Sequence, residues 1–198
     1  MGLSAPYYLI GKTEKYPIAA VNGRFQPFHK GHLEYILTAK SHCDFLCVGI
    51  TQYDISHLIR SPLDAHREEP KNNPLTYFER VEMVTEILLG NGFKFSDFCI
   101  TPFPIDEVGD TQNYLPRDIP IFTTICDKWN FDKIRALEGQ GYKVKVLFER
   151  AEKKYSGMTI RRLILSGDEK WKEMVPPEAV RVIEATNMKD RLNGFNYG

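Results

Sequence analysis

Short runs of apolar residues recur along the chain, and stretches whose apolar positions are spaced three or four residues apart lie between many of them. A short apolar run between turn residues is typical of a buried strand, whereas spacing of three and four is typical of a helix that covers a sheet. The runs predict strands over residues 18–21, 45–50, 98–103, 119–125 and 142–148.

The stretches between these runs predict helices. Leu33, Ile36 and Leu37 form one apolar stripe, in a helix that starts near residues 30–32. Thr76 and Glu79 form a capping-box signature before a second stripe. Further helical segments are predicted over residues 129–137, 159–165, 170–175 and 177–185.

Strands that alternate with helices along a chain predict an α/β fold. We expect a Rossmann-like, mostly parallel sheet with helices on both faces, in which ligands bind at the carboxyl ends of the strands. Residues 1–16 are interpreted as an N-terminal extension, and residues 17–198 as one domain with a C-terminal helical segment. A loop over residues 51–74 is long for a compact domain and indicates a functional loop or an insertion.

The composition favours a soluble, cytoplasmic domain with no nucleic-acid or membrane partner. There are 26 basic and 26 acidic residues, so zero net charge provides no general attraction to nucleic acid or anionic membrane. No apolar stretch approaches the ~20 residues that span a bilayer, and the first residues show no secretory pattern. The 4 cysteines form no CxxC pair, so we expect neither a zinc site nor a disulfide framework.

The most informative segment is residues 23–32, Gly-Arg-Phe-Gln-Pro-Phe-His-Lys-Gly-His, which joins a predicted strand to a predicted helix. Gly23 permits a close approach of the backbone to a ligand. The start of the helix presents free N–H groups and a partial positive charge, which suit a phosphate. His29 and His32 lie three residues apart, with Gly31 between them, so both rings can donate hydrogen bonds to one bound anion.

Isolated histidines at this spacing are more often surface residues, or half of a metal site, than anion ligands. A zinc site needs at least a third ligand nearby, and the sequence shows none. The strand, the glycine turn and Arg24 around the two histidines instead indicate an anion site.

A second segment, residues 155–162, reads Tyr-Ser-Gly-Met-Thr-Ile-Arg-Arg. Ser156 or Thr159 can cap the helix that follows. Arg161 then lies near the positive end of the helix dipole, where a cation is mildly unfavourable unless an anion binds beside it. A capped helix whose arginines face water is an equally good interpretation of this segment alone.

Together the two segments resemble the signatures of the nucleotidyltransferase superfamily with the (H/T)xGH motif, and they are most similar to archaeal-type nicotinamide mononucleotide adenylyltransferases. Residues 56–60 and 73–80 also resemble those enzymes, with residues 61–72 inserted between them. The family has an arginine from this region that reaches the phosphates; Arg60 is the better match, and Arg80 is interpreted as a structural residue.

The resemblance assigns roles to individual residues. Met158 stands where the family often has threonine. Catalytic roles are implied for His29, His32 and Arg161. Nucleotide binding is implied for Gly23, Arg24, Phe25, Gln26, Gly31, Arg60, Ser156, Gly157 and Thr159.

The acceptor site is where the resemblance weakens. Asp106 ends a segment that resembles the family's Pro-x-Pro-Asp, so it is implied to bind ribose hydroxyls or the acceptor; a turn-forming aspartate is the alternative. The archaeal enzymes carry an Asn and a Trp nearby that recognise nicotinamide, and Asn113 and Tyr114 are interpreted as their substitutes. Trp129 either stacks on a base or, as we prefer, begins a buried helix.

The implied reaction is transfer of AMP from ATP to a phosphate-bearing acceptor, expected to be nicotinamide (or nicotinate) mononucleotide, with release of pyrophosphate. Mg²⁺ is the expected cofactor, held by phosphates and water with no protein ligands. Two alternatives stay open: a cytidylyltransferase or another nucleotidyltransferase with a different phosphorylated acceptor, and a catalytically silent nucleotide-binding regulatory module. Because archaeal relatives form oligomers, the resemblance also implies a homo-oligomer.

Overall fold

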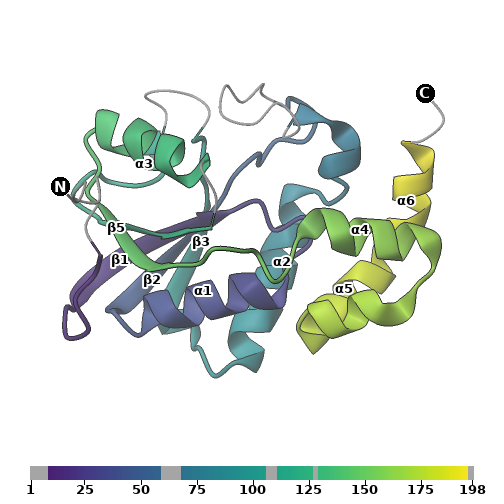
Figure 1. Ribbon diagram of the computed structural model, residues 1–198, viewed down its shortest axis with the longest axis horizontal. Helices are drawn as coiled ribbons and strands as arrows, with labels where there is room; N and C mark the ends of the chain where they lie inside the picture. The colour runs from purple at the N-terminus through teal and green to yellow at the C-terminus, as the bar shows by residue number, and fades with distance from the viewer. Residues whose placement is uncertain (1–8, 59–67, 106–110, 127–128, 196–198) are drawn as a thin grey trace.

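The computed structural model describes residues 9–58, 68–105, 111–126 and 129–195 (Figure 1). A five-stranded parallel sheet forms its centre, in the order β3-β2-β1-β4-β5. The strands are β1 (Tyr16–Gly23), β2 (Cys43–Ile50), β3 (Phe98–Pro102), β4 (Ile121–Ile125) and β5 (Val144–Glu149). All the predicted strands are therefore confirmed, with bounds that differ by a few residues.

Helices cover both faces of the sheet, as the alternating pattern predicts. The helices are α1 (Lys30–Lys40), α2 (Tyr77–Gly90), α3 (Trp129–Gly139), α4 (Gly157–Ser166), α5 (Pro177–Ala185) and α6 (Met188–Gly194). Figure 1 shows α3 on one side of the sheet, with α1 and α2 on the other. Because neighbouring strand residues point to opposite faces, Ala20 packs in the core under α3 while Val21 packs in the core under α1 and α2.

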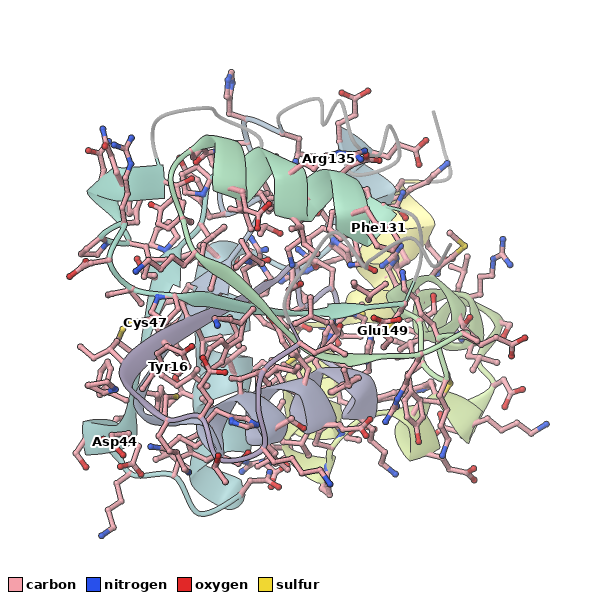
Figure 2. The ribbon with its side chains drawn as sticks, turned by 60° about the vertical axis from the view of Figure 1, so that its left-hand side comes forward. Tyr16, Asp44, Cys47, Phe131, Arg135 and Glu149 are labelled. Carbon is pink, nitrogen blue, oxygen red and sulfur yellow. The ribbon has the colours of Figure 1, made fainter. Side chains whose placement is uncertain are left out.

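The two central strands separate before they end. β1 pairs with β2 from Tyr16 to Gly23, but it pairs with β4 at Ala20 alone, opposite Ile121. The chain moves outward from β1 to β3 on one side and returns to β4 on the other, so the strand order reverses here. A crevice opens at such a switch point, beyond the carboxyl ends of the strands. Figure 2 labels Tyr16 at the amino edge of the sheet and Glu149 at this carboxyl edge.

The capping box predicted at the start of α2 is confirmed. The backbone N–H of Glu79 donates to the Thr76 hydroxyl at 3.2 Å, and the backbone N–H of Thr76 donates to the Glu79 carboxylate at 2.8 Å. Arg191 from α6 binds the same carboxylate at 2.6 Å. The cap therefore also fastens the C-terminal helices to α2.

The C-terminal segment differs from the prediction by one additional helix. The helical segment predicted over residues 170–175 is a 3-10 helix, Glu169–Met174. The helix α6 was not predicted because it buries only Met188 and Leu192, a stripe too short to stand out in the sequence.

The N-terminal segment adds one bridge to the sheet edge. Leu9 pairs with Val146 of β5 in parallel, and the N–H of Ile10 donates to the Val146 carbonyl at 2.9 Å. β1 begins at Tyr16, the last residue of the predicted extension. The division into an extension and a domain stays a prediction. The cysteines are free. No helix in the described ranges is long and apolar enough to cross a membrane.

Gly49→Ala tests the packing on the α3 face of the sheet. A Cβ atom at Gly49 would lie 2.6 Å from the ring of Phe103, so we expect the free energy of unfolding to fall by about 1–3 kcal/mol. Urea unfolding followed by circular dichroism measures it. Gly139→Ala is the matched control, because a Cβ there meets nothing within 4 Å. Equal stability of the two variants would contradict this packing.

Candidate active site

A cavity of about 450 Å³ opens at the carboxyl edge of the sheet. Its volume is typical of a site for a small molecule. The wall comes from the end of β1 and the turn after it (residues 22–27), the start of α1, the end of β4 (Thr123, Thr124 and Cys126), the start of α3, and the connection from β5 into α4. The two signature segments identified in the sequence therefore meet at one cavity.

His29 and His32 begin α1 and bind each other's backbone. His29 is the N-cap residue, and its Nδ1 accepts the backbone N–H of His32 at 3.3 Å. The Nδ1 of His32 accepts the backbone N–H of His29, also at 3.3 Å. The two rings stack with centroids 3.6 Å apart at 13°. This is a capping box in which imidazoles take the places of the usual hydroxyl and carboxylate.

These hydrogen bonds fix the tautomer of both rings. An Nδ1 that accepts carries no proton, so the neutral ring holds its proton on Nε2, which is left to donate to a ligand. Gly31 leaves room beside them, because a Cβ at this position would lie in tight contact, 3.2 Å from the Cε1 and Nδ1 atoms of His29.

Both rings are neutral at pH 7, although part of each faces the cavity. Burial lowers the pKa of His29 to about 4, and the positive charge of Lys153 adds to this effect. Burial also lowers the pKa of His32 well below its ordinary value, with contributions from His29 and then Arg24. The cavity therefore offers two uncharged donors of fixed orientation.

Arg161 projects from α4 into the same wall. Its Nη1 donates to the backbone carbonyl of Gln26 at 2.6 Å, and its Nη2 donates to the side-chain oxygen of Asn72. Burial lowers the pKa of Arg161 to about 10, so the group is still charged at pH 7. Gly157 allows the close approach, since a Cβ there would lie 2.8 Å from the Gln26 carbonyl. Both partners of this guanidinium are neutral.

Comparison with known proteins agrees with this geometry. Residues 20–163 match the family described as cytidylyltransferase-like. The chain belongs to this family. It is a nucleotidyltransferase with an α/β Rossmann-like fold.

Two relatives carry different activities in their names. A phosphonoformate cytidylyltransferase from Streptomyces viridochromogenes is 35% identical over 172 residues, which are 87% of this chain and 93% of the relative. A nicotinamide-nucleotide adenylyltransferase from Saccharolobus solfataricus is 32% identical over 171 residues, 86% of this chain and 91% of the relative. Close similarity to both classes leaves the donor and acceptor of this chain to be argued separately.

A solved structure shares the fold. The bifunctional NMN adenylyltransferase/ADP ribose pyrophosphatase from Francisella tularensis, complexed with AMP and a manganese ion, matches with a TM-score of 0.62 at 19% identity. The match covers 92% of this chain and 53% of that chain. The fold is therefore shared over nearly all of the present chain.

Several of the nucleotide-binding residues expected in this nucleotidyltransferase do line the cavity. They are Gly23, Arg24, Gly31, Ser156 and Gly157. Ser156 occupies the N-cap position of α4, but its side chain makes no cap hydrogen bond, so the expected capping role is wrong.

Phe25 and Gln26 touch the cavity but mainly support its wall. Phe25 is fully buried and packs its ring edge against His32, with centroids 5.0 Å apart. The side-chain amide of Gln26 donates to the Leu75 carbonyl at 2.8 Å and accepts the Leu75 N–H at 2.9 Å. Nucleotide contact by the Gln26 side chain would therefore break two buried bonds.

Other expected residues are not brought to the wall. Thr159 is exposed on α4, and Asn113 and Tyr114 also lie outside the set of residues that line the cavity. The acceptor-binding roles of Asn113 and Tyr114 stay predictions without support from this geometry. Arg60 and Asp106 fall outside the described residues.

Arg80 has the structural role expected from its position. It is fully buried and donates to the carbonyls of Thr51 at 2.8 Å, Gln52 at 2.7 Å and Arg24 at 3.1 Å. It thus ties the loop after β2 to the turn after β1.

The sequence analysis missed part of the wall. Lys153 lines the cavity beside the two histidines, and the basic run before Ser156 was a usable signal for it. Trp129 begins α3, as preferred, and also lines the cavity. Lys133 lies one turn later, with its Nζ 5.7 Å from the centre of the Trp129 ring.

The depressed pKa values of the two histidines predict acid sensitivity. In the unfolded chain His29 is protonated near pH 6.5, whereas in the folded chain it is protonated only near pH 4. The free energy of unfolding should therefore fall as the pH drops through this window. Urea unfolding at a series of pH values measures the slope. His29→Gln should flatten this slope. An unchanged slope in His29→Gln would refute the lowered pKa of His29 in the folded protein.

Proposed function

We propose that the protein transfers AMP from ATP to nicotinamide (or nicotinate) mononucleotide and releases pyrophosphate. The observation that carries nucleotidyl transfer is the convergence of His29, His32 and Arg161 on one cavity, although they come from segments at opposite ends of the chain. The partial positive charge at the start of α1 lies at the same place and suits an anion.

The chemistry follows from the charges of these groups. The Nε2–H of each histidine donates to a phosphate oxygen, and Arg161 and Arg24 stabilise the negative charge that develops in the transition state. The acceptor phosphate is already ionised near neutral pH, so the reaction needs alignment of the two substrates and no strong general base. The α-phosphorus is attacked directly, and no covalent enzyme intermediate forms.

A divalent cation, expected to be Mg²⁺, fits this site only together with the nucleotide. In the described part of the chain, no three His, Cys, Asp or Glu side chains gather as metal ligands. The wall instead carries cationic groups, among them Arg24, Lys153 and Arg161. The cation would take its ligands from phosphates and water, and it would offset phosphate charge during transfer.

A second candidate is cytidylyl transfer to a small phosphonate or phosphate. Two observations favour it: a relative named for that chemistry is 35% identical, and neither Asn113 nor Tyr114 lines the cavity. The silent regulatory module has less support, since the histidines and Arg161 are present and lie together. A homo-oligomer and a cytoplasmic location also stay predictions.

A matrix of donors and acceptors tests the proposal. Pyrophosphate release is measured with ATP or CTP, each against nicotinamide mononucleotide, nicotinate mononucleotide and phosphonoformate, with Mg²⁺. We expect kcat/KM for ATP with a mononucleotide to exceed every other pair by at least about tenfold. The reverse order, with CTP and phosphonoformate preferred, would establish the second candidate. Tight nucleotide binding without turnover of any pair would favour the silent module.

His32→Ala tests the role of the paired imidazoles. Loss of a donor to the transition-state charge should lower kcat by roughly 10²-fold or more, while circular dichroism shows a folded protein. His42→Gln, remote from the cavity, should keep wild-type turnover. Near-normal kcat in His32→Ala would count against the mechanism.

A further inference from the structure

The side chain of Asn72 lies between the guanidinium of Arg161 and the carboxylate of Glu69 and binds both. Asn72 ends the short 3-10 helix over Pro70–Asn72 and lines the cavity. Its side-chain oxygen accepts a hydrogen bond from Nη2 of Arg161. Its side-chain nitrogen donates to the Glu69 carboxylate at 2.8 Å. The reverse orientation would place an NH₂ group against the guanidinium and an oxygen against the carboxylate, so the network fixes this one.

The short helix that carries Asn72 is held together by its own hydrogen bonds. The backbone N–H of Asn72 donates to the Glu69 carbonyl at 2.9 Å, and the backbone N–H of Asn73 donates to the Pro70 carbonyl at 2.8 Å. The side-chain nitrogen of Asn73 binds the Glu69 carbonyl at 3.1 Å. Asn72 therefore presents its amide to Arg161 from an ordered turn.

Arg161 consequently remains electrostatically unbalanced. Arg161 is 7% exposed, and the partners of its guanidinium are the Gln26 carbonyl and the Asn72 amide. A buried charge is costly unless an opposite charge accompanies it. Glu69 interacts with Lys71, 3.4 Å away, and reaches Arg161 only through the Asn72 amide. The missing negative charge must come from whatever fills the cavity.

We propose that Asn72 is a positioning residue that aims the Arg161 guanidinium at the triphosphate while leaving its charge uncompensated. This inference rests on the proposed nucleotidyl transfer. It also gives a role to the end of the inserted segment, residues 61–72. A carboxylate at position 72 would orient Arg161 equally well, but it would neutralise the guanidinium and repel the phosphates.

The experiment separates orientation from charge. Asn72→Asp keeps the acceptor oxygen and adds a negative charge, whereas Asn72→Leu removes the acceptor and adds none. Asn193→Asp, on an exposed position of α6, controls for the change in net charge. Calorimetry measures the binding of inorganic tripolyphosphate with Mg²⁺. Pyrophosphate release gives kcat and KM for the preferred nucleotide, and thermal unfolding shows whether each variant is folded.

We expect Asn72→Asp to raise the tripolyphosphate Kd and the nucleotide KM by about tenfold or more. Asn72→Leu should mainly lower kcat, with a smaller change in Kd, because Arg161 loses its orientation and keeps its charge. Asn193→Asp should match the wild type in all three measurements. If Asn72→Asp does not fold, Asn72→Leu decides whether Asn72 orients Arg161: kcat should fall by a larger factor than the tripolyphosphate Kd rises.

An Asn72→Asp variant with wild-type Kd and KM would overturn the inference. So would a result in which both position-72 variants weaken tripolyphosphate binding and lower kcat to the same extent and also unfold at a lower temperature. Failure of the proposed function is read separately, from the wild type. A wild-type protein that binds neither ATP, CTP nor tripolyphosphate would refute nucleotidyl transfer before any variant is made.

Discussion

The parting of β1 and β4 is the constraint on which the rest of the site depends. The two strands pair at Ala20 and Ile121 and then separate, so sheet hydrogen bonding stops short of the carboxyl edge. β1 leads through a short turn directly into α1, which places the positive end of that helix over the gap. Within the gap the Tyr35 hydroxyl bridges the two strands, accepting the Asn22 N–H at 3.4 Å and donating to the Phe122 carbonyl.

Around that gap the wall carries Arg24, Lys153 and Arg161, together with Glu34 and Glu152. The histidines contribute as neutral donors, which avoids repulsion with Arg24 and Lys153 nearby. Arg161 contributes a full charge whose protein partners are neutral oxygens. Such a wall is incomplete without an anion. The same deficit that costs stability in the free protein favours a polyphosphate over an uncharged ligand of similar size.

Much of this architecture was predictable because its signals are local. The strands, the start of α1 and the Thr76–Glu79 cap each lie within a few neighbouring residues, and both signature segments are continuous in the sequence. The contacts that shape the wall are not local. Arg161 and Asn72 are 89 positions apart, and no periodicity or cap encodes their meeting. Acceptor residues were the least predictable, since they were chosen by resemblance where the chain departs from its relatives.

The long segment between β2 and α2 is fastened at both ends to the turn that follows β1. At its beginning, the N–H of Thr51 donates to the Gly23 carbonyl at 3.0 Å, and the Thr51 carbonyl accepts from Arg80. At its end, Leu75 pairs with the Gln26 amide as a neighbouring strand would. Doubling the length of a closed loop costs only about 0.6 kcal/mol. Residues can therefore be gained or lost between Thr51 and Pro70 during evolution without displacing the turn that follows β1 or the contact of Asn72 with Arg161.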